Sequence, residues 1–221
     1  ACHFDPSVLL CEGAVNNSCL SEDEVVAVNN VYAGTYSKAG EQLYPGSAKG
    51  FELGWRIPAA GSEPSALQAD STRYVVYEDP DWDWREFDME RDLALVREKA
   101  PYFEPLEADL GEFKARGGKL LFYHGWNDPG PSPLNTLAYY NAVLDTMGPE
   151  QDDWLRAFMM PGMGHCAGGI GPDNADFLGT MQAWVEEGVA PSRITAARIR
   201  EGRVDMTRPL CPYPEVATWD G

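Results

Sequence analysis

The chain has 221 residues, which is enough for one large domain or two small ones with a sizeable core. Hydrophobic residues make up 44% and charged residues 24% of it, and aromatic side chains are plentiful, so the composition excludes a disordered acidic tail. A formal net charge of −18 repels phosphate backbones and anionic membranes, and no apolar run of about 18 residues is present to span a bilayer. We therefore expect no nucleic-acid partner, no membrane partner, and a substrate that is neutral or anionic at one end only.

The first half of the chain is expected to be irregular, with two helices in it. Ser21 can cap a helix that runs to about Tyr32, because Glu24 completes a capping box and three valines fall on one face. Tyr74–Tyr77 fits a short strand and a helical piece equally well. A second helix is expected over Glu90–Lys99, before a proline that ends it. The three valines are Val25, Val28 and Val31.

The second half alternates apolar runs with polar loops and helical periods. Buried strands are expected at Lys119–Tyr123 and Leu155–Met160, each followed by a polar loop. Helices are expected over Pro133–Met147 and Asp173–Glu187, each stopped by a glycine. Ile194–Ile199 is expected to be the last strand.

This order of strand, loop and helix predicts an α/β fold with a parallel sheet. In such sheets functional groups collect on loops beyond the carboxyl ends of the strands, which is where both polar loops lie. We place a boundary within residues 111–117. Residues 1–115 then form an irregular, partly helical layer, and residues 116–221 form a sheet half-domain.

The cysteines indicate an oxidising compartment. Cys11 and Cys19 bracket a short polar loop, a spacing that suits a local disulfide. Asn16 opens a glycosylation sequon in that loop, so we expect a secreted protein, extracellular or periplasmic. Composition alone leaves open whether the other three cysteines are buried free thiols or are bonded to cysteines outside the chain. They are Cys2, Cys166 and Cys211.

Two of the three histidines, His124 and His165, follow the predicted strands, whereas His3 lies at the terminus. Around His165, glycines let the backbone turn sharply and present the imidazole. Asp128 follows the preceding strand, so a carboxylate and a histidine would meet at strand ends, as two members of a nucleophilic triad do. In α/β hydrolases the chain order is nucleophile, acid, base. The nucleophile is therefore expected upstream, and the chain contains no Gly-x-Ser-x-Gly motif.

Other interpretations of these residues stay open. A histidine in a glycine-rich loop is often hydrogen-bonded structure, and an aspartate before proline is commonly a turn residue. His124, Asp128 and His165, with Cys166 nearby, could bind a metal ion, although their spacing matches no tight zinc signature. If Asp128 and His165 are acid and base, Asp128 should accept a hydrogen bond from Nδ1 of His165. In that case His124 should make no comparable contact with Asp128.

Short motifs spread along nearly the whole chain form a specific set. The strongest are Tyr123-His-Gly-Trp-x-Asp-Pro129, Gly162-Met-x-His-Cys166 and Arg208-Pro-Leu-Cys-Pro-Tyr213. Others are Cys2-x-Phe-Asp-Pro6, Leu43-Tyr-Pro-Gly46 and Asp79-Pro-x-Trp-Asp-Trp84. Together they resemble the tannase and feruloyl esterase family, which also includes a bacterial enzyme that cleaves a terephthalate monoester.

The resemblance implies an α/β-hydrolase core with a large inserted lid. Residues 1–115 would be most of the lid, and residues 116–221 the C-terminal part of the core. Asp128 would be the triad acid and His165 the base. The family nucleophile is a serine that directly follows a cysteine, and no Cys-Ser dipeptide occurs in this chain. The resemblance therefore places the nucleophile upstream of residue 1.

The same resemblance implies partners for the remaining cysteines. Cys166 would pair with the cysteine before the nucleophile, and Cys2 with a cysteine that opens a calcium-binding loop of the lid. Cys211 would pair with a cysteine beyond Gly221. We therefore expect no cofactor in this chain, with a calcium site of the family type upstream of residue 1.

These residues predict a serine-type carboxylic ester hydrolase that acts on esters of aromatic, phenolic acids. This chain would supply the acid and the base, and an N-terminal segment or chain would supply the nucleophile. The alternative is a non-catalytic binding or interaction chain on a scaffold derived from a hydrolase. An N-terminal partner carrying the serine would decide between them.

Overall fold

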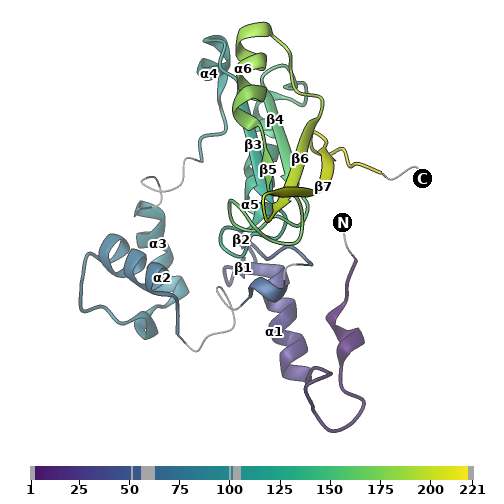
Figure 1. Cartoon of the computed structure of the whole chain (residues 1–221). Coiled ribbons are helices and arrows are strands. Elements are labelled where there is room, and N and C mark those ends of the chain that lie inside the picture. The colour runs from purple at the N-terminus through teal and green to yellow at the C-terminus, as the bar shows by residue number, and fades with distance from the viewer. Residues whose placement is uncertain (1–2, 51, 56–62, 100, 102–105, 219–221) are drawn as a thin grey trace. The chain divides into compact units, whose positions relative to one another are not determined.

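The structure of the chain is a computed structural model with two units, residues 1–106 and 107–221, and each is described by itself (Figure 1). The division falls before helix α4 (Gly111–Ala115), whereas the sequence suggested a boundary after residue 115. Helix α4 belongs to the second unit because Phe113 packs against Trp154, with ring centroids 6.0 Å apart. The described residues are 3–50, 52–55, 63–99, 101 and 106–218.

The longest described helix of the first unit, α1 (Glu22–Ala33), follows a short turn and precedes a small sheet. Its capping box is present as predicted: Ser21 Oγ accepts from the Glu24 amide at 3.2 Å, and the Glu24 carboxylate accepts from the Ser21 amide at 2.8 Å. The three valines named above are half-buried along one face of the helix, because they recur at helical spacing. The flanking elements are the 3-10 turn η1 (Pro6–Leu9) and the antiparallel strands β1 (Gly34–Tyr36) and β2 (Gln42–Pro45).

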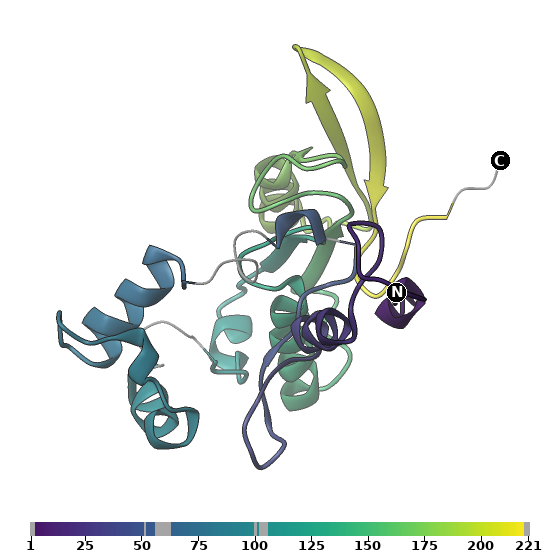
Figure 2. The ribbon, with the colours of Figure 1, turned by 90° about the horizontal axis from the view of Figure 1, so that it is seen from below.

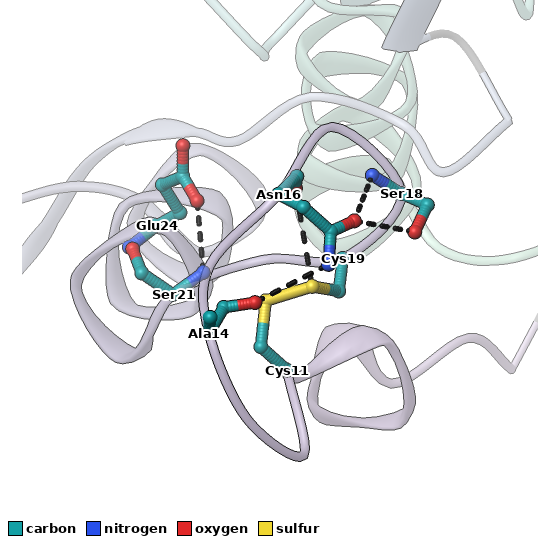
Figure 3. The surroundings of a disulfide bond; sticks show 7 residues. All are labelled: Cys11, Ala14, Asn16, Ser18, Cys19, Ser21 and Glu24. Atoms are coloured by element: carbon teal, nitrogen blue, oxygen red, sulfur yellow. Dashed lines mark hydrogen bonds between the residues drawn. A yellow bond between two sulfur atoms is a disulfide. The ribbon is translucent and has the colours of Figure 1, made fainter.

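A disulfide between Cys11 and Cys19 closes the loop before α1 (Figure 3). The loop ends are also joined by backbone hydrogen bonds, from the Cys11 amide to Leu20 and from the Leu20 amide to Leu9. Inside the loop, exposed Asn16 accepts hydrogen bonds through Oδ1 from the Ser18 amide at 2.9 Å and the Ser18 hydroxyl at 2.6 Å. Glycosylation of Asn16 stays a prediction.

The rest of the first unit is built from short helical pieces. Tyr74–Tyr77, which the sequence left undecided, lies mostly in a π-helical turn. Tyr77 stacks on Trp82 at 4.4 Å between ring centroids, and this contact fixes the turn against the following loop. The helix expected over Glu90–Lys99 is α3 (Met89–Lys99). The other pieces are η2 (Glu52–Gly54), α2 (Ala66–Ser71), η3 (Thr72–Val76) and η4 (Trp84–Glu86).

The second unit contains the predicted parallel pair of strands, β3 (Leu120–Gly125) and β4 (Leu155–Met160), which run side by side in Figure 1. Helix α5 (Pro133–Met147) connects them and begins as predicted, with Ser132 as cap and a proline in the first turn. Since the strands are parallel, their carboxyl ends meet: Gly125 lies opposite Met160.

Side chains on the two faces of this sheet enter two separate cores. On one face, apolar residues of β3 and β4 pack against α4 and α5 around Trp154, Tyr140 and Val143. On the other face, Phe158 and Met160 pack against Ile194 and Leu210. Burial on both faces explains why these strands read as continuous apolar runs.

The C-terminal part differs from the sequence-based expectation in two ways. Helix α6 (Phe177–Glu187) begins later than Asp173, because β5 (Asn174–Ala175) pairs with the next strand and Asp176 caps the helix. The strand expected at Ile194–Ile199, β6 (Ile194–Arg200), is not the last one.

A further strand, β7 (Arg203–Leu210), forms a hairpin with β6 that Figure 2 shows projecting in yellow. Most side chains of β7 are exposed, so it lacks the apolar alternation that reveals a half-buried strand. Among the described residues, no helix is long and apolar enough to cross a bilayer.

Candidate active site

Two loops meet at the carboxyl ends of β3 and β4. The amide of Trp126 donates to the carbonyl of Met160 at 3.0 Å, and that of Asn127 donates to Met163 at 2.9 Å. Gly125 makes this contact feasible, because a Cβ there would lie 2.3 Å from the carbonyl oxygen of Met163. The backbone that leads to His165 thus crosses directly over the end of β3.

Asp128 and His165 are joined by a hydrogen bond across these loops. Nδ1 of His165 lies 2.8 Å from Oδ2 of Asp128, which is the hydrogen bond that was expected of an acid and base pair. The Asp128 side chain is only 3% exposed, whereas that of His165 is 58% exposed. The other carboxylate oxygen, Oδ1, accepts from the Gly130 amide at 2.7 Å. A buried carboxylate therefore orients a solvent-accessible imidazole.

The expectation that His124 would make no comparable contact with Asp128 is wrong. Nε2 of His124 lies 2.9 Å from the same Oδ2 atom, and its Nδ1 lies 2.7 Å from Oγ1 of Thr136. His124 is the penultimate residue of β3, and Thr136 lies near the start of α5. Because both elements border the Asp128 loop, the fold brings three side chains together that sequence spacing did not connect.

The loop that carries His165 is shaped by glycines. Gly162 and Gly169 adopt φ of +81° and +92°, and the loop doubles back so that Gly171 donates to the carbonyl of Gly162. Cys166 also has a positive φ, +61°, and its side chain is exposed. Within the part of the chain that the structure describes, Nε2 of His165 has no hydrogen-bond partner. This nitrogen is therefore available to a reacting group.

The geometry of the site does not support the alternative that these residues bind a metal ion. In the described residues, no three His, Cys, Asp or Glu side chains are grouped so that they could hold a metal ion. The two imidazoles direct ring nitrogens at one carboxylate oxygen, at distances typical of hydrogen bonds. Cys166 and Cys211 form no disulfide within the described residues, and Cys2 lies outside them.

Known proteins resemble this chain along its whole length. The family described as tannase and feruloyl esterase matches it over residues 1–221. The chain belongs to this family. The probable feruloyl esterase B-2 of Aspergillus terreus is 35% identical to it. The aligned region is 243 residues long with its gaps and covers 100% of this chain and 46% of the relative.

Solved structures of the family share the fold. Feruloyl esterase B from Aspergillus oryzae is similar with a TM-score of 0.87 and 34% identity, over 96% of this chain and 46% of that one. Tannin acyl hydrolase from Aspergillus niger is similar with a TM-score of 0.74 over 96% and 44%, and its 20% identity supports the fold alone. The α/β-hydrolase fold class is confirmed, and the chain spans about half the length of these family members.

Sequence reasoning missed Thr136, Gly125 and Gly130 as parts of this site. Thr136 carries no signal of its own, because a threonine in the second turn of a helix is common. Gly125 and Gly130 flank the Asp128 turn, so their glycine identity was a signal that the backbone there is closely approached. The family motif Tyr123-His-Gly-Trp-x-Asp-Pro129 contained His124 and Gly125, but gave no role for either.

Proposed function

We propose that this chain supplies the acid and the base of a serine-type carboxylic ester hydrolase that acts on esters of aromatic, phenolic acids. The observation that carries this proposal is the 2.8 Å contact between Nδ1 of His165 and Oδ2 of Asp128 beyond neighbouring parallel strands. The names of two relatives, the probable feruloyl esterase B-2 and feruloyl esterase B, support this substrate class. The Cys11–Cys19 disulfide is in keeping with a secreted protein.

In this proposal His165 acts through its exposed nitrogen. As a serine hydroxyl attacks the ester carbonyl, its proton moves to Nε2 of His165, and the imidazolium then protonates the leaving alcohol. Water hydrolyses the acyl-enzyme by the same route in reverse. Asp128 holds the proton on Nδ1 and stabilises the imidazolium, which its burial makes effective because few waters screen it.

The nucleophile would come from a segment outside these residues. The sequence has no Cys-Ser dipeptide, the form in which the family carries its serine. Among the described residues, β3 pairs with a strand on the β4 side only, and parallel sheets are rarely left with an open edge. A further strand from the nucleophile segment would fit this edge. A calcium site of the family type would also belong to that segment.

Hydrolysis of methyl ferulate tests the proposal. The 221-residue chain alone should stay at background, because an acid and a base without a nucleophile leave little catalysis. A longer form that includes the upstream segment should be active; its Asp128→Asn variant should lose about 10⁴-fold in kcat, and its His165→Ala variant about 10⁶-fold. Serine-dependent turnover by the chain alone would contradict the upstream nucleophile.

A non-catalytic binding chain is the second candidate, because the sequence lacks the family nucleophile. The two candidates differ in the longer form. An inactive longer form that still binds ferulate with Asp128 and His165 intact would favour the binding chain. Loss of activity in the two variants, with ferulate binding retained, would favour the esterase.

A further inference from the structure

His124 is a partly buried histidine that the acid and base mechanism does not use. Its side chain is 13% exposed, yet both ring nitrogens have partners: Oδ2 of Asp128 at 2.9 Å and Oγ1 of Thr136 at 2.7 Å. The oxygen that it contacts is the one that holds His165. One carboxylate oxygen therefore receives two imidazoles, from β3 and from the loop after β4.

The hydrogen-bond partners assign the proton on each ring. Asp128 accepts from the Gly130 amide and from Nδ1–H of His165, as an ionised carboxylate does. Two lone pairs at 2.9 Å would repel, so Nε2 of His124 must carry its proton and donate it to Oδ2. When the ring carries this one proton only, the lone pair on Nδ1 accepts from the Thr136 hydroxyl. His124 and His165 are thus opposite tautomers.

We propose that His124, held by Thr136, is a positioning residue for the pair of Asp128 and His165. Its N–H fixes the rotation of the Asp128 side chain, so that Oδ2 stays aimed at Nδ1 of His165. Without this donor the carboxylate could rotate away from His165 while Oδ1 keeps its hydrogen bond with the Gly130 amide. The exposed imidazole of His165 would then be free to take its proton on Nε2. The catalytic significance of this role rests on the proposed function, whereas the hydrogen bonds of His124 do not depend on it.

Nitrogen NMR of the 221-residue chain tests the geometry directly, because only three histidines contribute signals. At about pH 8.5, where ordinary imidazoles are neutral, His124 should carry its proton on Nε2 and His165 on Nδ1. A proton on Nδ1 of His124 would overturn the proposal without any variant.

Four variants measure the coupling. In His124→Phe the ratio of the Nδ1–H to the Nε2–H tautomer of His165 should fall about fivefold, as the loss of one hydrogen bond allows. His124→Gln keeps a donor near Oδ2 and should recover most of the ratio, which a role in packing alone would not predict. Thr136→Val should give a smaller fall, and its matched control Thr136→Ser should resemble the wild type. An unchanged ratio in folded His124→Phe would overturn the proposal, and so would a failure of His124→Gln to recover it.

If His124→Phe does not fold, the pair Thr136→Val and Thr136→Ser decides in its place, and equal ratios in the two would overturn the proposal. In the longer form, His124→Phe should lower kcat about 10–100-fold with KM unchanged, by analogy with the loss of hydrogen-bonded partners that orient the ligands of metal sites. A longer form without esterase activity would contradict the proposed function and leave the NMR result standing. An unchanged kcat in an active longer form would refute the positioning role.

Discussion

At the residue scale, the site depends on the close approach of two backbone segments as much as on the chemistry of its side chains. Asp128 and His165 are separated by 37 residues, and their contact exists because the loop after β4 crosses the end of β3 without obstruction. Gly125 is the residue at that crossing, where a Cβ would meet two backbone carbonyls at 2.3 and 2.6 Å. Backbone atoms cannot move aside as a flexible side chain can.

Gly125→Ala should therefore separate the two loops. We expect unfolding of the second unit in urea to require about 1–3 kcal/mol less free energy, the usual result of overpacking. The Nδ1–H signal of His165 should weaken as its distance from Asp128 grows. Gly13→Ala is the control, because a Cβ there meets no atom within 4 Å. Equal stability of the Gly125 variant and the wild type would show that the crossing can relax.

At the element scale, short helices are stabilised by charge as well as by capping. Asp92 in α3 is 5% exposed and accepts two hydrogen bonds from Arg91, each at 2.6 Å. The Arg91 guanidinium holds the pKa of the Asp92 carboxyl well below its usual range, against the opposing effect of burial. An acid with a depressed pKa in the folded state stabilises that state above its unfolded pKa and loses this effect as the pH falls.

Asp92→Asn should therefore make the free energy of unfolding of the first unit depend less on pH in the acid range. We expect the wild type to be more stable than this variant at neutral pH, and the difference to shrink below about pH 4, where unfolded aspartates protonate. Urea midpoints between about pH 6 and pH 2 provide the measurement. Glu98→Gln, at an exposed position of the same helix, is the control. A difference that does not change with pH would contradict the assignment.

At the scale of the whole molecule, the chain has two units, and only the first contains a disulfide among the described residues. Cys11 and Cys19 are 8 positions apart, so their bond closes a short loop. A bond of this kind stabilises by restricting the unfolded chain of the loop that it closes, and this loop lies in the first unit.

The double variant Cys11→Ser, Cys19→Ser should destabilise the first unit by about 2–3 kcal/mol. Hydrogen exchange of backbone amides, followed on separate peptides, measures the stability of each unit. Protection from exchange should fall in α1 and stay constant in β3 and β4. Cys166→Ser is the control, since that thiol is exposed and free. Equal loss of protection in both units would mean that they unfold together.

The sequence by itself determined the elements whose signals are local. The capping box at Ser21, the proline start of α5 and the apolar runs of β3 and β4 were all predicted, because each depends on residues a few positions apart. The same holds for the pairing of an acid and a histidine at strand ends, since parallel strands bring their carboxyl ends together. The Asp128–His165 hydrogen bond follows from that rule.

Only the tertiary structure decided which side chains share the Asp128 carboxylate. His124 and Thr136 lie on different elements, and a sequence cannot tell that a strand end and a helix start border the same loop. The exposed strand β7 was missed for a related reason: its partner β6 supplies the hydrogen bonds, so the strand needs no apolar pattern of its own. Contacts between distant segments depend on how elements pack, and that information is spread over the whole fold.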